Sequence, residues 1–430
     1  MNMLKHLSLQ NVGPAAKLEL DFAPRLNLIT GDNGLGKSFL LDIAWWALTR
    51  RWPAEVNPRL TSGSRALPAG DGPARIGFCF TGKVKTEDYV SEYLPRDQAW
   101  KGRPGRPANP GLVFYALSDG SFAVWDPARN YWRTGGDVDV QDRIPAYVFS
   151  PTEVWDGLPE KDGKRPCLGL VMDWAGWQKQ KSEAFDLLKQ VLTTLSPSEK
   201  EPLVPGELTR ISLDDARDIP TIRMPYGQDV PVLHASAGIR RILSLAYVLV
   251  WAWEEHRKAV RLLKEEPTQQ LVLLMDEVES HLHPQWQRRI VPALLAVAKT
   301  LVHKNNAQLQ LITATHSPLV MASSEPLFNA DLDAWWDLDL ERKRVVLTRR
   351  PFQKHGDAAG WLTSKAFDLT SSRPVEYEAL VTKAAALLAA NAPDPKKLKA
   401  MQADLIQALG PTDDFLFNWR YVCKTKGWLP

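Results

Sequence analysis

The stretch Gly31–Ser38 constrains the fold of this chain more than any other segment. It matches the phosphate-binding pattern G-x-x-x-x-G-K-[ST] at every fixed position. The preceding residues, Arg25–Thr30, are typical of a short buried strand, and Phe39–Leu48 predict an apolar helix. A strand, a glycine loop and a helix in this order direct backbone N–H groups and the positive end of the helix dipole at phosphate oxygens.

Two side chains of this loop have chemical roles in such a site. We expect Lys37 to reach the β- and γ-phosphates of ATP and the Ser38 hydroxyl to coordinate Mg²⁺. A chance glycine turn before a core helix is the alternative, which partner motifs further along the chain would disfavour. The residues expected to surround the phosphates are Asn33, Gly34, Leu35, Gly36, Lys37, Ser38 and Phe39.

A second motif is the apolar run Leu271–Met275, which is followed by Asp276 and Glu277. A strand that is apolar throughout is buried on both faces, and ligands bind at its carboxyl end in an open α/β sheet. We expect Asp276 to hold Mg²⁺ through water and Glu277 to orient and deprotonate the attacking water. A solvated acidic turn is the alternative for this segment alone, but the glycine loop in the same chain favours the catalytic interpretation.

Strands and helices are predicted to alternate around these two motifs, which indicates an α/β fold with a mixed, largely parallel central sheet. We expect an N-terminal ATPase lobe over residues 1–235, with antiparallel β and helical inserts, a C-terminal ATPase lobe over 236–350, and a small helical appendage over 351–430. Predicted strands are Leu4–Val12, Lys17–Phe22, Ala74–Phe80, Leu112–Leu117, Phe122–Trp125, Ala146–Phe149, Gln269–Met275 and Leu309–Thr313. Predicted helices are Leu168–Leu195, Gly238–Arg257 and Trp286–Leu301.

Ser236 and Gly238 lie at the start of the predicted helix Gly238–Arg257. A hydroxyl and free N–H groups at a helix start can bind an anion, and an ordinary serine N-cap is the alternative. After the second motif, His281 and His283 are two residues apart and precede Pro284. This spacing cannot provide the i, i+4 pair of a helical metal site, so metal ligation there is disfavoured.

Composition sets broader bounds. The 430 residues carry a net charge of +3, and their hydrophobic fraction of 44% is that of an ordinary soluble globular protein. Cys79, Cys167 and Cys423 form no C-x-x-C pair, which favours a reducing cytoplasm. The apolar runs are too short to span a bilayer, so no membrane association is expected. The basic segment Lys101–Arg106 leaves nucleic acid open as a partner, although a solvated surface loop is the favoured interpretation.

Taken together, these motifs resemble the ABC-type ATPases, in particular the overcoming-lysogenization-defect-like group of P-loop ATPases. In that family the segment at Ser236 and Gly238 is the signature motif, which binds the γ-phosphate of the other protomer's ATP; its usual second glycine is Ala237 here. Thr315–Pro318 matches a shared Thr-His-Ser-Pro run, which implies that His316 hydrogen-bonds the γ-phosphate or the attacking water. No glutamine follows the strand Ala146–Phe149, where the resemblance places a glutamine loop.

The layout is similar to that of ATPase subunits of bacterial antiphage defence systems such as Septu and the retrons. The resemblance implies a head-to-tail homodimer or higher oligomer that hydrolyses ATP and regulates a separately encoded nuclease or toxin. The alternative is a nucleotide-gated clamp for DNA or a partner with little turnover, and Glu277 speaks against it because a pure clamp needs no base. A transporter subunit is disfavoured by the long insert between Lys37 and Asp276, and a coiled-coil repair ATPase by the absence of heptad arms.

Overall fold

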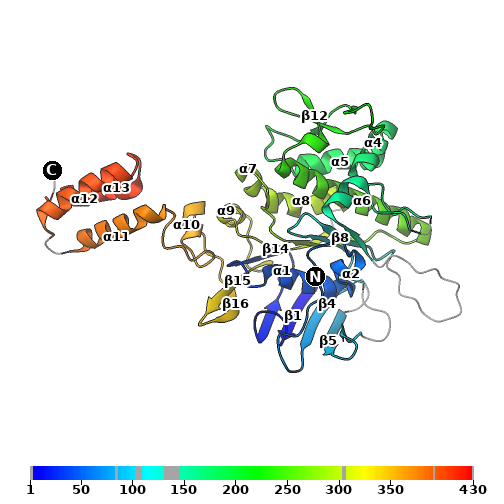
Figure 1. The fold of residues 1–430 in the computed structure, drawn as a ribbon, viewed down its shortest axis with the longest axis horizontal. Coiled ribbons are helices and arrows are strands. Elements are labelled where there is room, and N and C mark those ends of the chain that lie inside the picture. Colours follow the sequence, from blue (N-terminus) through cyan, green and yellow to red (C-terminus); the bar gives the residue numbers. More distant parts are fainter. Residues whose placement is uncertain are drawn as a thin grey trace. The chain divides into compact units, whose positions relative to one another are not determined.

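The computed structural model describes residues 3–82, 86–102, 109–129, 146–161, 163–302, 307–390 and 393–428. The chain forms two compact units, Met1–Trp361 and Leu362–Pro430 (Figure 1). All of the nucleotide motifs lie in the first unit. Arg103 and Arg106 of the predicted basic loop lie outside the described residues.

The first unit is built on an eight-stranded mixed sheet with the order β16-β15-β3-β14-β13-β7-β8-β9. Strands β15, β3, β14, β13 and β7 run parallel to one another, whereas β16, β8 and β9 are each antiparallel to a neighbour. The carboxyl ends of the parallel strands therefore meet at one edge, and the predicted α/β class is confirmed. The strand bounds are β3 Leu26–Gly31, β7 Leu112–Ala116, β8 Phe122–Trp125, β9 Tyr147–Phe149, β13 Gln270–Met275, β14 Gln308–Ala314, β15 Asp333–Glu341 and β16 Arg344–Arg350.

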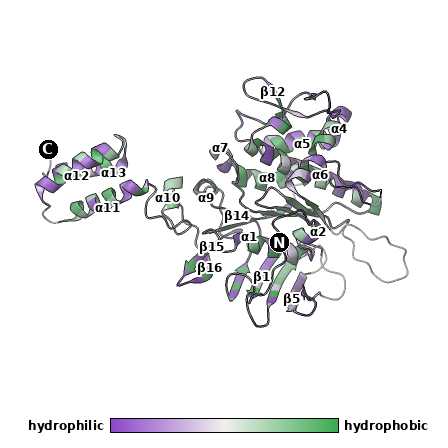
Figure 2. Ribbon diagram, in the orientation of Figure 1, coloured by the Kyte–Doolittle hydropathy of each residue, from purple (hydrophilic) through white to green (hydrophobic). Residues whose placement is uncertain are grey.

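A second sheet is antiparallel, has the order β2-β1-β4-β5-β6, and forms the predicted antiparallel subdomain. Hydrophobic and hydrophilic residues alternate along β1 (Figure 2), because one face of the sheet is packed and the other is exposed. Its strand bounds are β1 Leu4–Gln10, β2 Lys17–Asp21, β4 Arg75–Thr81, β5 Thr86–Leu94 and β6 Ala99–Trp100.

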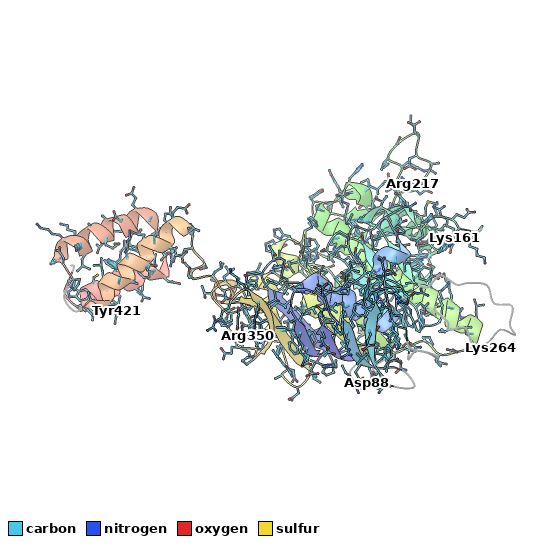
Figure 3. All side chains as sticks on the ribbon, turned by 60° about the horizontal axis from the view of Figure 1, so that its bottom comes forward. Asp88, Lys161, Arg217, Lys264, Arg350 and Tyr421 are labelled. Carbon is cyan, nitrogen blue, oxygen red and sulfur yellow. The ribbon has the colours of Figure 1, made fainter. Side chains whose placement is uncertain are left out.

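Helices α4, α5, α6, α7 and α8 gather on one side of the central sheet (Figure 1), where α8 packs against β14 and α5 packs against α6 and α8. The longest, α6, runs from Ala237 to Leu263 and ends at Lys264, whose left-handed backbone closes the helix (Figure 3). The helix bounds are α2 Pro53–Val56, α3 Pro151–Asp156, α4 Leu170–Gln180, α5 Glu183–Thr194, α7 Pro284–Gln287, α8 Ile290–Val302, α9 Pro318–Ser324 and α10 Ala358–Leu362. A small sheet has the strands β10 Val204–Pro205, β11 Thr221–Arg223 and β12 Asp229–Pro231.

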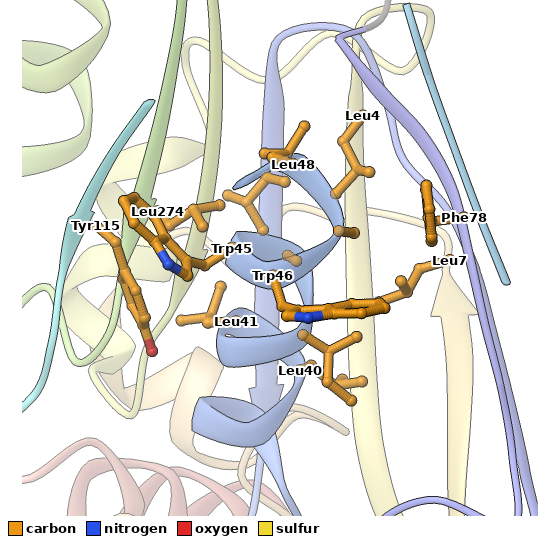
Figure 4. Packing of buried hydrophobic residues seen from close by; sticks show 14 of the residues in the cluster. Leu4, Leu7, Leu40, Leu41, Trp45, Trp46, Leu48, Phe78, Tyr115 and Leu274 are labelled. Carbon is orange, nitrogen blue, oxygen red and sulfur yellow. The ribbon is translucent and has the colours of Figure 1, made fainter. Parts of the chain in front are cut away.

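Helix α1, Lys37–Thr49, lies between the two sheets and joins them into one core (Figure 4). Trp45 extends toward Tyr115 of the central sheet, with ring centroids 6.2 Å apart. Trp46 extends the opposite way, toward Phe78 of the antiparallel sheet, with ring centroids 6.0 Å apart. The helix is therefore buried on two sides, which anchors the glycine loop at its N-terminus.

Two helix predictions were wrong. The single helix expected over Leu168–Leu195 is broken at Lys181, which is left-handed with φ 48°, and Ser182 then caps α5. The helix expected over Trp286–Leu301 is also two helices, because Pro292 lacks an N–H and fits only in the first turn of α8. Apolar periodicity continued across both breaks and concealed them.

The second unit is the predicted helical tail, with helices α11 Val375–Ala389, α12 Pro395–Ala408 and α13 Asp414–Thr425. Its own small core contains Leu398, Leu405 and Trp419. Arg373 forms an ion pair with Asp413, and Asp413 also caps α13 by accepting hydrogen bonds from two backbone N–H groups. Among the described residues of both units, none of the helices combines the length and apolarity needed to cross a bilayer.

Candidate nucleotide-binding site

The glycine loop has a backbone conformation that glycine adopts far more readily than residues with a side chain. Gly31, Gly34 and Gly36 have φ values of 132°, 80° and 101°. A Cβ at Gly31 would lie 2.2 Å from the carbonyl oxygen of Leu338, and one at Gly36 would lie 2.9 Å from Cγ of Pro14. The loop is thus held against β15 on one side and the β1–β2 turn on the other.

The start of α1 is open to an anion. Its N-cap, Gly36, supplies no side-chain hydrogen bond, so the N–H groups of the first turn keep their capacity to bind phosphate. The loop residues Asn33 and Gly34 are exposed, whereas Leu35 is buried and fastens the loop to the core. Phe39 faces Gly13 of the β1–β2 turn, where a Cβ would lie 2.3 Å from its ring.

Lys37 is buried above this loop. Its Nζ donates hydrogen bonds to the carbonyl oxygens of Gly31 at 2.7 Å and Asp32 at 2.8 Å. Burial lowers the pKa of Lys37, and the carboxylates of Asp276, Asp32 and Glu277 oppose this shift. Because burial penalises the charged form of Lys37, an anionic partner such as a phosphate would stabilise the ammonium group.

Asp276 stands at the carboxyl end of β13, where its backbone N–H donates to the carbonyl oxygen of Ala116 at 2.9 Å. Asp276 is 2% exposed, and burial raises its pKa, whereas the Ser38 hydroxyl opposes the rise. Oδ1 of Asp276 is buried and has no hydrogen-bond partner in the described part of the chain. A hydroxyl beside an unpaired carboxylate oxygen is the oxygen donor set that Mg²⁺ prefers, so these two residues fit the predicted metal.

Glu277 follows on a left-handed backbone with φ 47°, an uncommon conformation for a residue with a side chain. The next acid, Glu279, accepts hydrogen bonds from Oγ1 of Thr315 at 2.7 Å and from the backbone N–H of His316 at 2.5 Å. Burial raises the pKa of Glu279 even though these bonds oppose the rise. Glu279 therefore ties the segment after β13 to the segment after β14, a role that its position in the sequence did not suggest.

His316 is half-buried and lies near Lys37 and Glu277. Burial lowers its pKa first, the Lys37 ammonium lowers it further, and Glu277 opposes both effects. The imidazole is therefore neutral near pH 7 and can donate one hydrogen bond and accept another. The structure thus brings Lys37, Glu277 and His316 together with Ser38 and Asp276 at one edge of the sheet.

Ser236 and Gly238 have other contacts. Ser236 caps α6 by accepting a hydrogen bond from the N–H of Ile239 at 3.4 Å, and it is exposed together with Ala237. Gly238 is buried against the segment after β13, where a Cβ would lie 2.7 Å from the carbonyl oxygen of His281. The start of α6 is thus attached to its own chain through Gly238 and offers Ser236 to the outside.

Several polar groups beside Asp276 were not predicted. Because β7 is the parallel neighbour of β13, the turn that follows β7 ends next to Asp276, and the Ser118 hydroxyl of this turn opposes the rise in the pKa of the Asp276 carboxylate. Asp119 in this turn accepts hydrogen bonds from the hydroxyls of Thr61 and Ser62. The strands on both sides of this turn were predicted from the sequence, and they pair as a hairpin, but the place of the turn beside Asp276 depends on the strand order of the sheet.

A buried carboxylic acid lies one helical turn after Ser38. Burial raises the pKa of Asp42 to about 7, and the hydroxyl of Tyr115 donates to its Oδ1 at 2.9 Å. The carboxylates of Asp276 and Asp119 add to this rise. No sequence motif marks Asp42, because its surroundings come from β7 and β13.

The fold and this group of residues define a P-loop ATPase. Residues 26–322 match the family described as "AAA domain, putative AbiEii toxin, Type IV TA system". This match covers well over half of the chain, so the chain belongs to this family.

Individual relatives agree with the resemblance derived from the motifs. Septu protein PtuA of Bacillus thuringiensis is 22% identical over 342 residues, which cover 74% of this chain and 72% of that protein. The probable ATPase of retron Ec83 of Escherichia coli is 25% identical over 158 residues, 36% of this chain and 26% of that protein. The probable ATPase of retron Vc95 of Vibrio cholerae serotype O1 biovar El Tor is 30% identical over 132 residues, 30% of this chain and 23% of that protein.

Solved structures with a similar fold include the SMC head domain from Thermotoga maritima, which is 16% identical with a TM-score of 0.38. That match covers 82% of this chain and 100% of the SMC head. The recombination mediator protein RecF is also 16% identical, with a TM-score of 0.37, and the match covers 80% of this chain and 98% of RecF.

Proposed function

We propose that this chain binds ATP with Mg²⁺ and hydrolyses it between two copies arranged head to tail. The observation that carries the proposal is the convergence of the motif side chains at the carboxyl edge of β3, β13 and β14, where Oδ1 of Asp276 is buried and has no hydrogen-bond partner among the described residues. The groups that converge are Lys37, Ser38, Asp276, Glu277 and His316.

Each side chain has a distinct task in this proposal. The loop N–H groups and Lys37 bind the phosphates, and Lys37 exchanges its bonds to Gly31 and Asp32 for phosphate oxygens. Ser38 and Asp276 hold Mg²⁺, which neutralises the phosphate charge when it is bound.

The attacking water is handled by the two remaining groups. Glu277 orients it and accepts its proton, and neutral His316 donates a hydrogen bond to a γ-phosphate oxygen. Glu279 keeps His316 in position through its backbone N–H.

The second copy completes the site. Exposed Ser236 and the N–H groups at the start of α6 would bind the γ-phosphate held by the partner, where the helix dipole favours negative charge. Because both surfaces must meet across one γ-phosphate, ATP would favour the closed dimer and hydrolysis would release it.

The similarity to Septu PtuA and to the retron ATPases supports the biological part of the proposal. We infer that the dimer, or a higher oligomer built from it, acts in the bacterial cytoplasm and regulates a separately encoded nuclease or toxin effector in antiphage defence. The test is to express the chain with the product of the neighbouring open reading frame and to measure nuclease or toxin activity with ATP and without it. A membrane permease in that position would contradict the defence assignment.

The variant Glu277→Gln tests the catalytic part. Its amide cannot accept the proton of the water, so we expect turnover to fall by about 10²–10⁴-fold while ATP binding persists. Light scattering after size-exclusion chromatography should show that the dimer accumulates with Mg-ATP. Exposed Glu341 provides the matched control, because Glu341→Gln removes the same charge away from the site. Full turnover in Glu277→Gln would show that Glu277 is not the base, and tight binding with negligible turnover in the unmodified chain would favour the clamp.

A further inference from the structure

Arg241 lies in the second turn of α6, after the Ser236–Gly238 motif, and reaches back to the central sheet. Its Nη2 donates a hydrogen bond of 2.7 Å to the carbonyl oxygen of Leu117, which directly follows β7. The guanidinium carbon lies 5.4 Å from the ring centroid of Phe122 on β8, within the range of a cation–π contact. The preceding residue, Arg240, is exposed instead.

The other terminal nitrogen of Arg241 also faces this turn. Nη1 is buried, has no hydrogen-bond partner in the described residues, and lies 3.5 Å from where a Cβ of Gly120 would stand. Burial lowers the pKa of Arg241, and the charges that oppose the shift are Asp119, Asp276 and Glu277. A buried guanidinium with a free N–H costs stability, so packing alone is a poor reason for an arginine at this place.

The turn that Arg241 contacts also touches the magnesium-binding side of the site. The carbonyl of Ala116 accepts a hydrogen bond of 2.9 Å from the N–H of Asp276. The Ser118 hydroxyl opposes the rise in the pKa of the Asp276 carboxylate. Leu117, to which Arg241 donates, stands between Ala116 and Ser118. Asp119 fastens the far side of the turn by accepting hydrogen bonds from the Ser62 hydroxyl at 2.8 Å and from the Ser121 N–H at 2.9 Å.

We propose that Arg241 is a positioning residue that links the nucleotide site of its own chain to α6 through the turn Leu117–Gly120. This inference rests on the proposed function, because α6 carries the motif that the partner's nucleotide would meet. Binding of Mg-ATP beside Asp276 would shift the turn, and the hydrogen bond that Arg241 donates to Leu117 would carry this shift to α6. Gly238, packed on the carbonyl of His281, provides a second attachment of α6 to the segment after Glu277.

Hydrogen–deuterium exchange measures this link directly. The full chain carrying Glu277→Gln is diluted until size-exclusion chromatography shows only monomer, and exchange of the peptide over residues 234–245 is compared with and without Mg-ATP. We expect Mg-ATP to slow this exchange at least threefold when Arg241 is present. The matched control Arg240→Ala should show the same slowing, because Arg240 is exposed one position earlier in the same helix.

The variant Arg241→Ala should bind Mg-ATP within about threefold of the parent and protect the glycine-loop peptide, yet lose the ATP-dependent slowing over 234–245. In the parent without Glu277→Gln, it should lower kcat at least tenfold with little change in KM. Arg241→Lys, which keeps the charge and one donor, should recover part of both effects.

The outcomes separate this inference from the proposed function. Unchanged ATP-dependent slowing in Arg241→Ala, or equal losses in Arg241→Ala and Arg240→Ala, would overturn the role of Arg241. Loss of Mg-ATP binding together with a lower Tm would also overturn it, because Arg241 would then only support the fold. If the glycine-loop peptide of the parent shows no protection by Mg-ATP, the proposed ATPase itself fails.

Discussion

Helix α1 is thirteen residues long, and its two ends lie in opposite kinds of surroundings. The first turn carries Lys37 and Ser38 among carboxylates, with left-handed glycines before it. The later turns carry Trp45 and Trp46, which are 0% and 5% exposed and pack on two different sheets. The comparison teaches that the costly polar end is held in place by the apolar end, which contributes no chemistry to the site.

The largest effect should come from breaking the apolar end. Trp46→Ala removes a ring that stacks on Trp52, with ring centroids 5.4 Å apart. The same ring lies at 89° to the ring of Phe78 and at 55° to that of Trp100. We expect the free energy of unfolding to fall by about 3–5 kcal/mol, measured by urea denaturation. The molecules that stay folded should bind ATP within about threefold of the parent, and a larger loss of affinity would show that the two ends are not separate.

A substitution at the polar end should have the opposite effect, with a large loss of ATP affinity and a small change in the free energy of unfolding. Lys37→Ala removes the ammonium group that is poised over the loop, so we expect ATP affinity to fall at least about 100-fold, or roughly 3 kcal/mol, by titration calorimetry. The free energy of unfolding should change by less than about 1 kcal/mol, because the buried ammonium is itself desolvated. Lys17 on β2 is exposed and lies outside this group, so Lys17→Ala is the control. Retained affinity in Lys37→Ala would contradict its assignment.

We expect the smallest effect on stability at Asp42, which lies in α1 between the polar first turn and the apolar later turns. Its folded-state pKa of about 7 lies above the ordinary value near 4, so the folded chain keeps a proton that the unfolded chain has lost between these values. The free energy of unfolding should therefore fall as the pH rises from 4 to 7.

Asp42→Asn removes this titration and can still accept the hydrogen bond from Tyr115. We expect the loss of stability between pH 5 and pH 8, followed by urea denaturation, to shrink by roughly 2 kcal/mol relative to the parent. An identical pH dependence in the two proteins would show that Asp42 is not the group responsible.

Local sequence patterns were sufficient for a large part of the fold and the site. The glycine loop with its flanking strand and helix, and the acidic pair after β13, follow from residues adjacent in the chain, so they could be predicted without tertiary contacts. Strand β15 and the edge strand β16 were missed because charged residues such as Glu341 and Arg349 conceal their alternation. The break at Lys181 was missed because apolar residues recur at helical spacing on both sides of it.

By itself, then, the sequence determined which chemical groups are present and which short elements carry them, because hydrophobic period and glycine conformation are local properties. Only the tertiary structure decided that Ser118, Asp119 and Arg241 stand beside Asp276. That placement requires β7 to pair next to β13, although more than 150 residues separate them in the chain. Strand order results from how whole elements bury their apolar faces together, and no single segment records it.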